Sequence, residues 1–376
     1  MKIIEAISDM NIGGAGILLL TRLEHSPEYL KQTTVVLPKG SKLCDRLEAL
    51  NVHYVEVDGN YDRSFDFKSI FKCIRLIRSV GADIVNCHGC LSVRIAAFLT
   101  RVPVRLYTKH CVFPIKPWQK NFIYRYAYRT VQLLLSQRVI AVAYAARDDL
   151  VSLGIPADRI DVIINGVGGV RRISVAERLA VREMYGIPAD VTVVGIFARL
   201  EEYKGHTDFL DAAAYILRKS RRYRFLIVGD GSAREALTAR VSRLGISKYV
   251  IFTRFIEDVA PLMNIVDINV NCSWGPETSS LALSEGMSLG IPCIASEYGG
   301  NTYMVKNGKN GFTYPIGDHV SLARRIILLS RSNRVRSKLS EGARLRFETE
   351  LNAEKMCRQT YDLYNDLACR QGIDVN

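Results

Sequence analysis

The sequence has no long apolar run. No stretch of its 376 residues approaches the roughly 18 consecutive apolar residues of a transmembrane helix. The most apolar segment, residues 131–146, contains an arginine and several polar side chains. Glu5 and Asp9 interrupt the hydrophobic character of the first ten residues, which predict a strand and not a signal peptide. We therefore expect a cytoplasmic protein.

Disulfide and zinc patterns are also missing. The nine cysteines are odd in number and show no framework spacing, so we expect reduced thiols. Cys87 and Cys90 match the C-x-x-C redox pattern, but Cys87 ends an apolar strand and simple burial explains it better. A zinc site would need a second pair of ligands at a suitable spacing, and none is evident.

Acidic residues are absent from one sixth of the chain. The 64 residues between Asp83 and Asp148 contain no Asp or Glu and carry ten cations. The rest of the chain holds 41 bases against 38 acids, so most of the net charge of +13 lies in this segment. A concentrated positive field usually faces nucleic acid, acidic lipid or a phosphorylated substrate.

Part of this basic segment mixes cations with aromatic side chains. Such a mixture is typical of nucleic-acid stacking surfaces and of helices at a lipid interface. A helix with a buried aromatic side and a solvated basic side gives the same pattern, and no compact nucleic-acid motif accompanies it. The residues assigned to an acceptor or membrane surface are Lys116, Trp118, Lys120, Arg125 and Arg129.

Short apolar runs do alternate with amphipathic helices from end to end. The helix expected over residues 208–218, for example, places its apolar side chains on one stripe. Strands that alternate with helices predict parallel sheets with helices on both faces. The expected strands are 3–8, 34–37, 52–57, 84–87, 104–108, 139–143, 162–164, 191–197, 224–228, 250–252, 268–271 and 292–296.

A glycine-rich turn at residues 165–169 divides the chain. The length favours two domains, and a new series of strands begins after this turn and one further helix. We predict doubly wound domains at residues 1–170 and 171–351, followed by a polar helix over 352–371. Ligands of open parallel sheets bind outside the carboxyl ends of the strands, so we expect the chemistry in the loops there.

Two of these loops carry weak signals on their own. Gly13 and Gly14 open a helix after the first strand, where the backbone can approach an anion closely, although packing alone explains many such turns. Arg199 and Lys204 flank the loop after strand 191–197. A guanidinium and an ammonium there suit a diphosphate, and solvated loop cations are the alternative.

The loop and helix after strand 268–271 are more specific. Glu277 lies in the loop, Glu285 lies on the helix, and Ser279 or Ser280 can cap that helix. Carboxylates accept hydrogen bonds from sugar hydroxyl groups. Either acid alone can equally be a surface acid near a helix start.

Together these motifs resemble retaining glycosyltransferases of family 4. The resemblance covers essentially the whole chain, and the motifs occur in the family's order. The matches are Gly13-Gly14 in the glycine loop, His110 at the position of an active-site histidine, Asn165-Gly166-Val167 at the domain junction, Arg199, Lys204 and Gly205 in R-x4-K-G, and Glu277 and Glu285 in E-x7-E.

The resemblance implies the GT-B fold, in which two Rossmann-like doubly wound domains face across a cleft. The N-terminal domain would bind the acceptor, the C-terminal domain would bind the nucleotide sugar, and the final helix would pack back onto the first domain. Arg199 and Lys204 would hold the donor diphosphate and stabilise the leaving nucleotide, whose phosphate would help to deprotonate the acceptor.

The resemblance also implies contacts to the donor sugar and nucleoside. His110 would contact the sugar near its anomeric centre, Glu277 would bind the sugar, and Glu285 would bind the ribose. The other implied contacts are the amides of Thr278, Ser279 and Ser280 with the sugar, Gly13 and Gly14 with the phosphate, and Arg254, Phe255, Ile256 and Val259 near the base.

The sequence departs from the family in one donor-binding element. Thr278-Ser279-Ser280 replaces the more frequent G-F-G after the first acid, so the resemblance does not identify the donor sugar. No Asp-x-Asp motif is present, the motif with which another glycosyltransferase fold holds a metal. This favours metal-independent phosphate handling by cations and helix dipoles. His88, which follows strand 84–87, is a further candidate site residue.

We therefore expect a retaining, metal-independent hexosyltransferase without a cofactor. It would move a sugar from a nucleotide diphosphate, UDP foremost, to a lipid-linked or polysaccharide-precursor acceptor in surface-glycan synthesis. Its expected partners are the nucleotide sugar, that acceptor and an anionic membrane at the inner face of the plasma membrane, and no nucleic acid. A transferase with a soluble acceptor and a basic nucleic-acid-binding protein are the alternatives.

Overall fold

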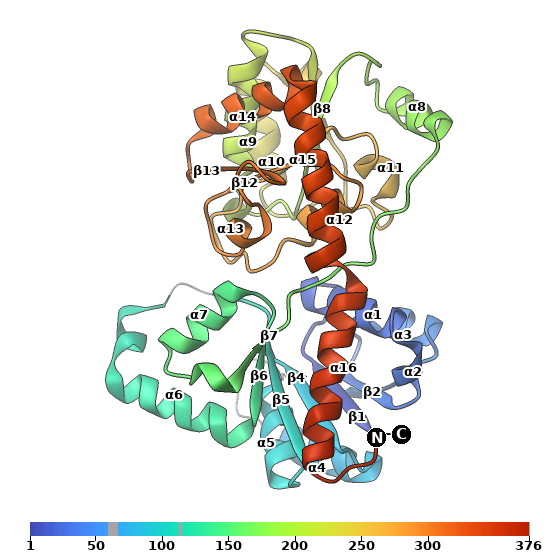
Figure 1. Ribbon diagram of the computed structural model, residues 1–376, viewed down its shortest axis with the longest axis vertical. Coiled ribbons are helices and arrows are strands. Elements are labelled where there is room, and N and C mark those ends of the chain that lie inside the picture. Colours follow the sequence, from blue (N-terminus) through green and yellow to red (C-terminus); the bar gives the residue numbers. More distant parts are fainter. Residues whose placement is uncertain (59–66, 113–114, 376) are drawn as a thin grey trace. The chain divides into compact units, whose positions relative to one another are not determined.

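The computed structural model describes residues 1–58, 67–112 and 115–375. The chain forms two compact units. The N-terminal unit comprises Met1–Gly168 and Ala353–Asn376, and the C-terminal unit comprises Gly169–Asn352. Each unit contains one open parallel sheet with helices packed on it (Figure 1). The predicted α/β class with two doubly wound sheets is confirmed.

The sheet of the N-terminal unit has the strand order β3-β2-β1-β4-β5-β6-β7, with every pair parallel. β1, β2 and β4 are buried along their whole length because helices cover both faces of the sheet. The strands are β1 (Ile3–Ile7), β2 (Thr33–Pro38), β3 (His53–Val57), β4 (Ile84–His88), β5 (Val104–Lys109), β6 (Arg138–Ala141) and β7 (Ile160–Val162).

The helices of this unit connect consecutive strands and pack on the sheet. They are α1 (Gly14–Glu24), α2 (Pro27–Leu30), α3 (Cys44–Ala49), α4 (Phe67–Val80), α5 (Leu91–Leu99), α6 (Phe122–Leu135) and α7 (Tyr144–Ser152), with 3₁₀ turns η1 (Pro117–Lys120) and η2 (Ala157–Arg159).

The C-terminal helix α16 (Ala353–Arg370) packs on the N-terminal unit. The Ala353 amide donates to the Val167 carbonyl at 3.0 Å, and the rings of Tyr361 and Tyr29 stack with centroids 3.6 Å apart. Figure 1 shows α16 beside α1, so two segments that are far apart in sequence complete one layer.

The sheet of the C-terminal unit has the order β10-β9-β8-β11-β12-β13, again with every pair parallel. Its core includes Phe209 and Phe225, whose rings meet edge to face with centroids 5.6 Å apart. The strands are β8 (Thr192–Phe197), β9 (Tyr223–Val228), β10 (Val250–Phe252), β11 (Ile268–Asn271), β12 (Cys293–Ser296) and β13 (Gly311–Tyr314).

The strand expectations were incomplete at one edge, because β13 was not predicted. Its four residues begin with a glycine and include a threonine, so they form no apolar run. Pairing with β12 makes them a strand. The helices of this unit are α8 (Val175–Met184), η3 (Glu202–Lys204), α9 (His206–Leu217), α10 (Arg234–Arg243), η4 (Ser247–Tyr249), α11 (Ala260–Met263), α12 (Leu281–Ser288), α13 (Asn301–Met304), α14 (His319–Arg331), α15 (Asn333–Arg346) and the π-helix η5 (Phe347–Leu351).

Candidate active site

The predicted donor-binding residues lie in loops at one edge of the C-terminal sheet. Because all its strands are parallel, the loops that follow β8, β9, β10, β11 and β12 leave the sheet at the same edge. Arg199 and Lys204 follow β8, and Glu277 follows β11, the strand that pairs with β8. The sheet topology thus brings sequence-distant charges together.

Lys204 and Glu277 form an ion pair at this edge. The Lys204 Nζ lies 2.7 Å from Glu277 Oε2, and the two side chains are 15% and 8% exposed. The same oxygen accepts hydrogen bonds from Ser273 Oγ at 2.9 Å and from Asn271 Nδ2 at 3.4 Å. The carboxylate is therefore held in one place, and the ammonium keeps N–H donors that Glu277 does not use.

Tyr203 connects the two predicted cations, a role that the sequence did not reveal. Arg199 Nη2 donates to the Tyr203 hydroxyl at 2.9 Å, and Lys204 Nζ lies 5.6 Å from the centre of the Tyr203 ring. The Tyr203 carbonyl also accepts from the Trp274 amide at 2.9 Å. Tyr203 thereby joins the loop after β8 to the loop after β11.

The close approach of these loops requires glycine. Gly205 has φ +68°, and a Cβ there would lie 2.0 Å from the Cys272 carbonyl oxygen. A Cβ on Gly275 would lie 2.4 Å from Tyr203 Cβ. His206, the next residue after Gly205, is buried, and burial together with Lys204 lowers its pKa to about 4. His206 is therefore uncharged at neutral pH.

A buried network of polar side chains supports Glu277, and it was not predicted from the sequence. Asn271 at the end of β11 accepts from the Ser273 amide at 2.9 Å and from Asn301 Nδ2 at 3.3 Å. Asn301 also donates to Ser296 at the end of β12, at 3.0 Å. Polar residues at the ends of adjacent strands are a signal that could have indicated this network.

The loop before α12 carries Thr278, Ser279 and Ser280, the residues whose amides were predicted to contact the sugar. Ser280 caps the helix by accepting from the Leu283 amide, as predicted. Its own amide lies 3.1 Å from Met304 Sδ and donates there. Thr278 is buried and Ser279 is half-buried.

Glu285 lies on α12 and is half-buried by its solvent-accessible surface. Burial raises the pKa of Glu285 to about 7. A carboxyl group that ionises near neutral pH is a candidate hydrogen-bond partner for a ligand. Glu277 and Glu285 therefore differ in environment, since Glu277 pairs with Lys204.

The residues predicted near the nucleobase occupy the loop between β10 and α11. Phe255 is 73% exposed, and Arg254 is exposed, with its Nη1 atom 4.0 Å from Asp230 Oδ2. Ile256 packs against the core, and Val259 precedes α11. The exposed aromatic ring is thus the part of this loop that is available for stacking.

The glycine loop of the N-terminal unit contains one position with open space. Gly13 is the N-cap of α1, and a Cβ there would lie 3.1 Å from the Asp9 carboxylate. A Cβ on Gly14 would meet nothing within 4 Å. Packing therefore does not account for glycine at position 14, and a ligand can approach there.

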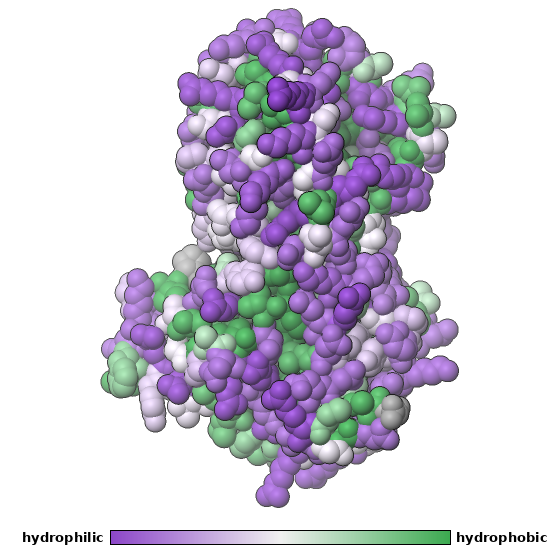
Figure 2. Space-filling view, viewed as in Figure 1, coloured by the Kyte–Doolittle hydropathy of each residue, from purple (hydrophilic) through white to green (hydrophobic). Residues whose placement is uncertain are grey.

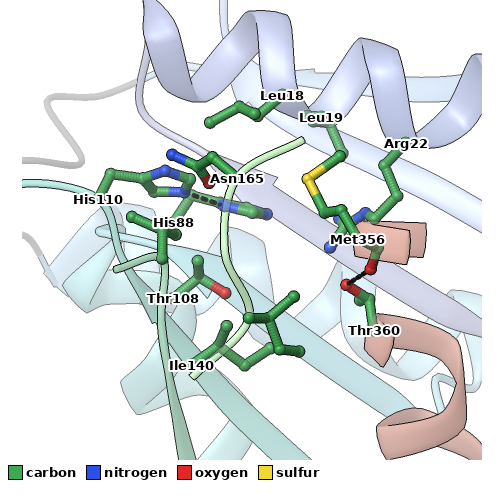
Figure 3. A pocket seen from close by; sticks show the side chains of 12 residues that line it. Leu18, Leu19, Arg22, His88, Thr108, His110, Ile140, Asn165, Met356 and Thr360 are labelled. Carbon is green, nitrogen blue, oxygen red and sulfur yellow. Dashed lines mark hydrogen bonds between the residues drawn. The ribbon is translucent and has the colours of Figure 1, made fainter. Parts of the chain in front are cut away.

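His110 directly follows β5, and His88 ends the adjacent strand β4. Their rings are hydrogen-bonded, with His88 Nδ1 and His110 Nε2 2.6 Å apart. Both residues line a pocket inside the N-terminal unit (Figure 3). The structure thus brings the two candidate histidines together.

The basic segment is divided between internal and surface cations. Arg94 is buried and donates to Gln132, and Lys109 and Arg138 pair with acids that lie after the acid-free stretch. These three cations stabilise the fold, so the ten charges do not form one surface field. The cations Lys116, Lys120, Arg125 and Arg129 are exposed.

Comparisons with known proteins identify the class. Residues 12–168 match the profile described as Glycosyltransferase Family 4, and residues 177–346 match the profile described as Glycosyl transferases group 1. The crystal structure of Anabaena HepE in complex with UDP superposes with a TM-score of 0.86 at 22% identity, over 97% of this chain and 100% of that one.

The names of two curated relatives describe enzymes of glycan synthesis. The Escherichia coli UDP-Gal:alpha-D-GlcNAc-diphosphoundecaprenol alpha-1,3-galactosyltransferase is 26% identical over 80% of each chain. The Staphylococcus aureus capsular polysaccharide biosynthesis glycosyltransferase CapM is 20% identical over 88% of this chain and 94% of its own. The protein is therefore a glycosyltransferase with the GT-B fold. Within that class, the N-terminal unit is similar to glycosyltransferase family 4 and the C-terminal unit is similar to group 1.

Proposed function

We propose that the protein is a retaining hexosyltransferase that uses a UDP-sugar to build a surface glycan. The observation that carries the proposal is the Lys204–Glu277 pair beside Arg199, at the strand edge where parallel sheets bind ligands. The named substrates of the Escherichia coli relative and the UDP and UDP-glucose complexes of Anabaena HepE support a UDP donor. Proton NMR of the product tests retention, since the new linkage should keep the anomeric configuration of the donor.

The donor diphosphate would be bound by Arg199 and Lys204. Arg199 is exposed and donates to an uncharged hydroxyl group, so its charge is available to a phosphate. Cations preorganised next to the leaving UDP stabilise the negative charge that develops on it. This arrangement supports transfer without a metal. Activity should survive dialysis against EDTA, and a loss that Mg²⁺ or Mn²⁺ restores would contradict metal independence.

Lys204→Ala tests the donor site. We expect UDP to raise the melting temperature of the wild-type protein and to leave that of Lys204→Ala unchanged. The matched control is Lys219→Ala, which removes a lysine beyond the other end of α9 and should keep the UDP effect. Lys204→Arg keeps a positive charge beside Glu277, so a fall in the ligand-free melting temperature of Lys204→Ala that Lys204→Arg does not share measures how much the ion pair stabilises the fold. A full UDP effect in Lys204→Ala would refute the site.

We further propose that α6 and the turn before it attach the protein to anionic membranes, where a lipid-linked acceptor resides. Hydrophobic and hydrophilic side chains share the exposed surface of this segment (Figure 2), and the hydrophilic ones include exposed cations. This arrangement differs from a buried aromatic side with a solvated basic side, because Trp118, Phe122, Ile123 and Tyr126 are all more than half exposed. Aromatic insertion and cationic attraction act together at such surfaces.

Four exposed cations in this segment favour an anionic membrane as its partner. Lys116, Lys120, Arg125 and Arg129 are exposed, and no ion pair links any of them to an acid within the described ranges. Each base near an anionic bilayer contributes about 1 kcal/mol. No described helix is long and apolar enough to cross a membrane.

Sedimentation with vesicles tests this attachment. The wild-type protein should bind vesicles that contain anionic lipid at low salt, and Phe122→Ser with Ile123→Ser should weaken binding at least about tenfold, because two apolar side chains no longer insert. Arg221→Ser with Arg222→Ser, which removes charge from the C-terminal unit, is the control. Binding to oligonucleotides with equal affinity, or no binding to vesicles, would contradict the proposal.

A further inference from the structure

A chain of polar side chains runs through the N-terminal unit and ends at His110. It begins at Glu5 on β1, which is 1% exposed. Glu5 Oε2 lies 2.9 Å from His88 Nε2, and His88 Nδ1 lies 2.6 Å from His110 Nε2. Because β1, β4 and β5 are neighbours in the sheet, the three side chains form a continuous path.

The other contacts of Glu5 fix it as an acceptor. Its Oε1 atom pairs with Arg22 at 2.7 Å and accepts from the Tyr364 hydroxyl at 2.8 Å, while Asn86 Nδ2 donates to Oε2 at 3.0 Å. Burial alone would raise the pKa of Glu5, but Arg22, His88 and Tyr364 outweigh it and lower the pKa to about 2. The carboxylate is ionised and can only accept hydrogen bonds.

The direction of each hydrogen bond follows from this acceptor. His88 Nε2 must carry a proton, since it faces a carboxylate. In a neutral ring the other nitrogen, Nδ1, is then an acceptor, so His110 Nε2 must donate to it. Burial, and to a smaller extent the Arg22 guanidinium, hold the pKa of His110 well below its usual value, which keeps its ring neutral. His110 Nδ1 is then left without a proton.

His110 is one of the residues that line a pocket of the N-terminal unit. His110 Nδ1 is buried and has no hydrogen-bond partner among the described residues. The pocket is small, with a cavity volume of about 30 Å³, and it is partly open to solvent. Figure 3 shows the two histidines on one side, with Leu18 and Leu19 of α1 and Met356 of α16 on the other. Hydrogen-bond acceptors among apolar walls are typical of ligand sites.

We propose that Glu5 and His88 are positioning residues that lock His110 in the Nε2–H tautomer, so that its Nδ1 accepts a hydrogen bond from a sugar hydroxyl group. The hydroxyl belongs to the transferred sugar or to the acceptor, which share this chemistry. The inference rests on the proposed function for its ligand. The tautomer itself is independent of that function. His110 is the catalytic residue here, and Glu5 and His88 act through it.

Nitrogen-15 NMR of protein labelled at histidine tests the lock. Wild-type His110 should show a protonated Nε2 and an unprotonated Nδ1. His88→Phe removes the acceptor of the His110 Nε2–H, and Glu5→Gln allows either tautomer of His88, so both variants should give mixed tautomers at His110. The control is Tyr364→Phe, which removes a donor to Oε1 and leaves Oε2 with His88, and it should match the wild type. A proton on His110 Nδ1 in the wild type, or an unchanged tautomer in His88→Phe, would overturn the proposal.

Kinetics separates this inference from the proposed function and identifies the hydroxyl group. Glu5→Gln and His88→Phe should lower kcat at least about tenfold, while KM for the nucleotide sugar changes less than about twofold. A loss of both donor hydrolysis and transfer assigns the hydroxyl to the transferred sugar, and a loss of transfer alone assigns it to the acceptor. Unchanged kcat in both variants would overturn the role. UDP stabilisation that survives Lys204→Ala would refute the donor site and leave the tautomer result standing.

Discussion

At the scale of single residues, the two glutamates of the predicted E-x7-E motif have different environments. Glu277 is fixed by Lys204 and by two uncharged donors. Glu285 is half-buried, and burial raises its pKa to about 7 from an ordinary value of 4.5. The residue types and spacing predicted a site, but their ionisation depends on neighbours that the sequence does not place.

The raised pKa of Glu285 predicts a pH-dependent cost to stability. Because the folded state holds this proton more tightly than the unfolded chain, the free energy of unfolding should fall as pH rises from about 4.5 to about 7, and then level off. Glu285→Gln removes the ionisation. With allowance for partial solvent exposure, the variant should be about 1 kcal/mol more stable than the wild type at pH 8.

Urea denaturation at pH 5 and pH 8 measures this effect. The stability difference between Glu285→Gln and the wild type should shrink at pH 5, where Glu285 is protonated in the folded protein. Glu341→Gln, on an exposed position of α15, is the control and should show no such pH dependence. A stability difference that is equal at both pH values would show that Glu285 has an ordinary pKa.

At the scale of elements, the strand pattern was predictable and the contacts between loops were not. The predicted strands appear with ends shifted by at most two residues, because apolar runs in an α/β chain seldom have another use. β13 was not predicted from the sequence, because its pairing with β12, and not its composition, makes it a strand. The roles of Tyr203 and Asn271 in the site were not predicted for a related reason, since these roles arise only where two loops meet.

The junction of these two loops depends on Gly205. Its φ of +68° disfavours other residues, and an added Cβ would lie 2.0 Å from the Cys272 carbonyl oxygen. Gly205→Ala should therefore destabilise the C-terminal unit by more than about 2 kcal/mol, the sum of conformational strain and a backbone clash. It should also weaken UDP binding, since Lys204 and Glu277 would separate.

Gly245→Ala is a matched control for this substitution. Gly245 has the same φ of +68°, but nothing lies within 4 Å of the added Cβ. The control should cost only the conformational strain, about 1 kcal/mol, and should leave UDP binding intact. Thermal unfolding of both variants measures the difference. Equal losses would mean that the loop junction adds nothing to the stability of the unit.

At the scale of the whole molecule, the N-terminal unit is built from two separate parts of the sequence. The turn at residues 165–169 indicated a boundary, and contacts place it after Gly168. Charge was less informative at this scale, because Arg94 is buried and Lys109 and Arg138 are paired with aspartates. Net charge alone therefore overestimates the surface that is open to an anionic partner.

The discontinuous N-terminal unit predicts that α16 is essential to one unit and dispensable to the other. The helix buries Met356, Tyr361 and Tyr364 against that unit, and Tyr364 donates to Glu5. Burial of a large apolar side chain contributes about 1.5–3 kcal/mol. Loss of several such side chains matches the whole stability of a typical domain, about 5–15 kcal/mol.

Truncation after Asn352 should therefore unfold the N-terminal unit and leave the C-terminal unit folded, because all contacts of α16 described above lie in the first unit. Calorimetry should show that one of two transitions is lost and that UDP still raises the temperature of the other. Truncation after Arg370 keeps the helix and should leave both transitions in place. If both transitions disappear in the shorter protein, the C-terminal unit depends on the N-terminal unit for its own stability, and the two are not independent folding units.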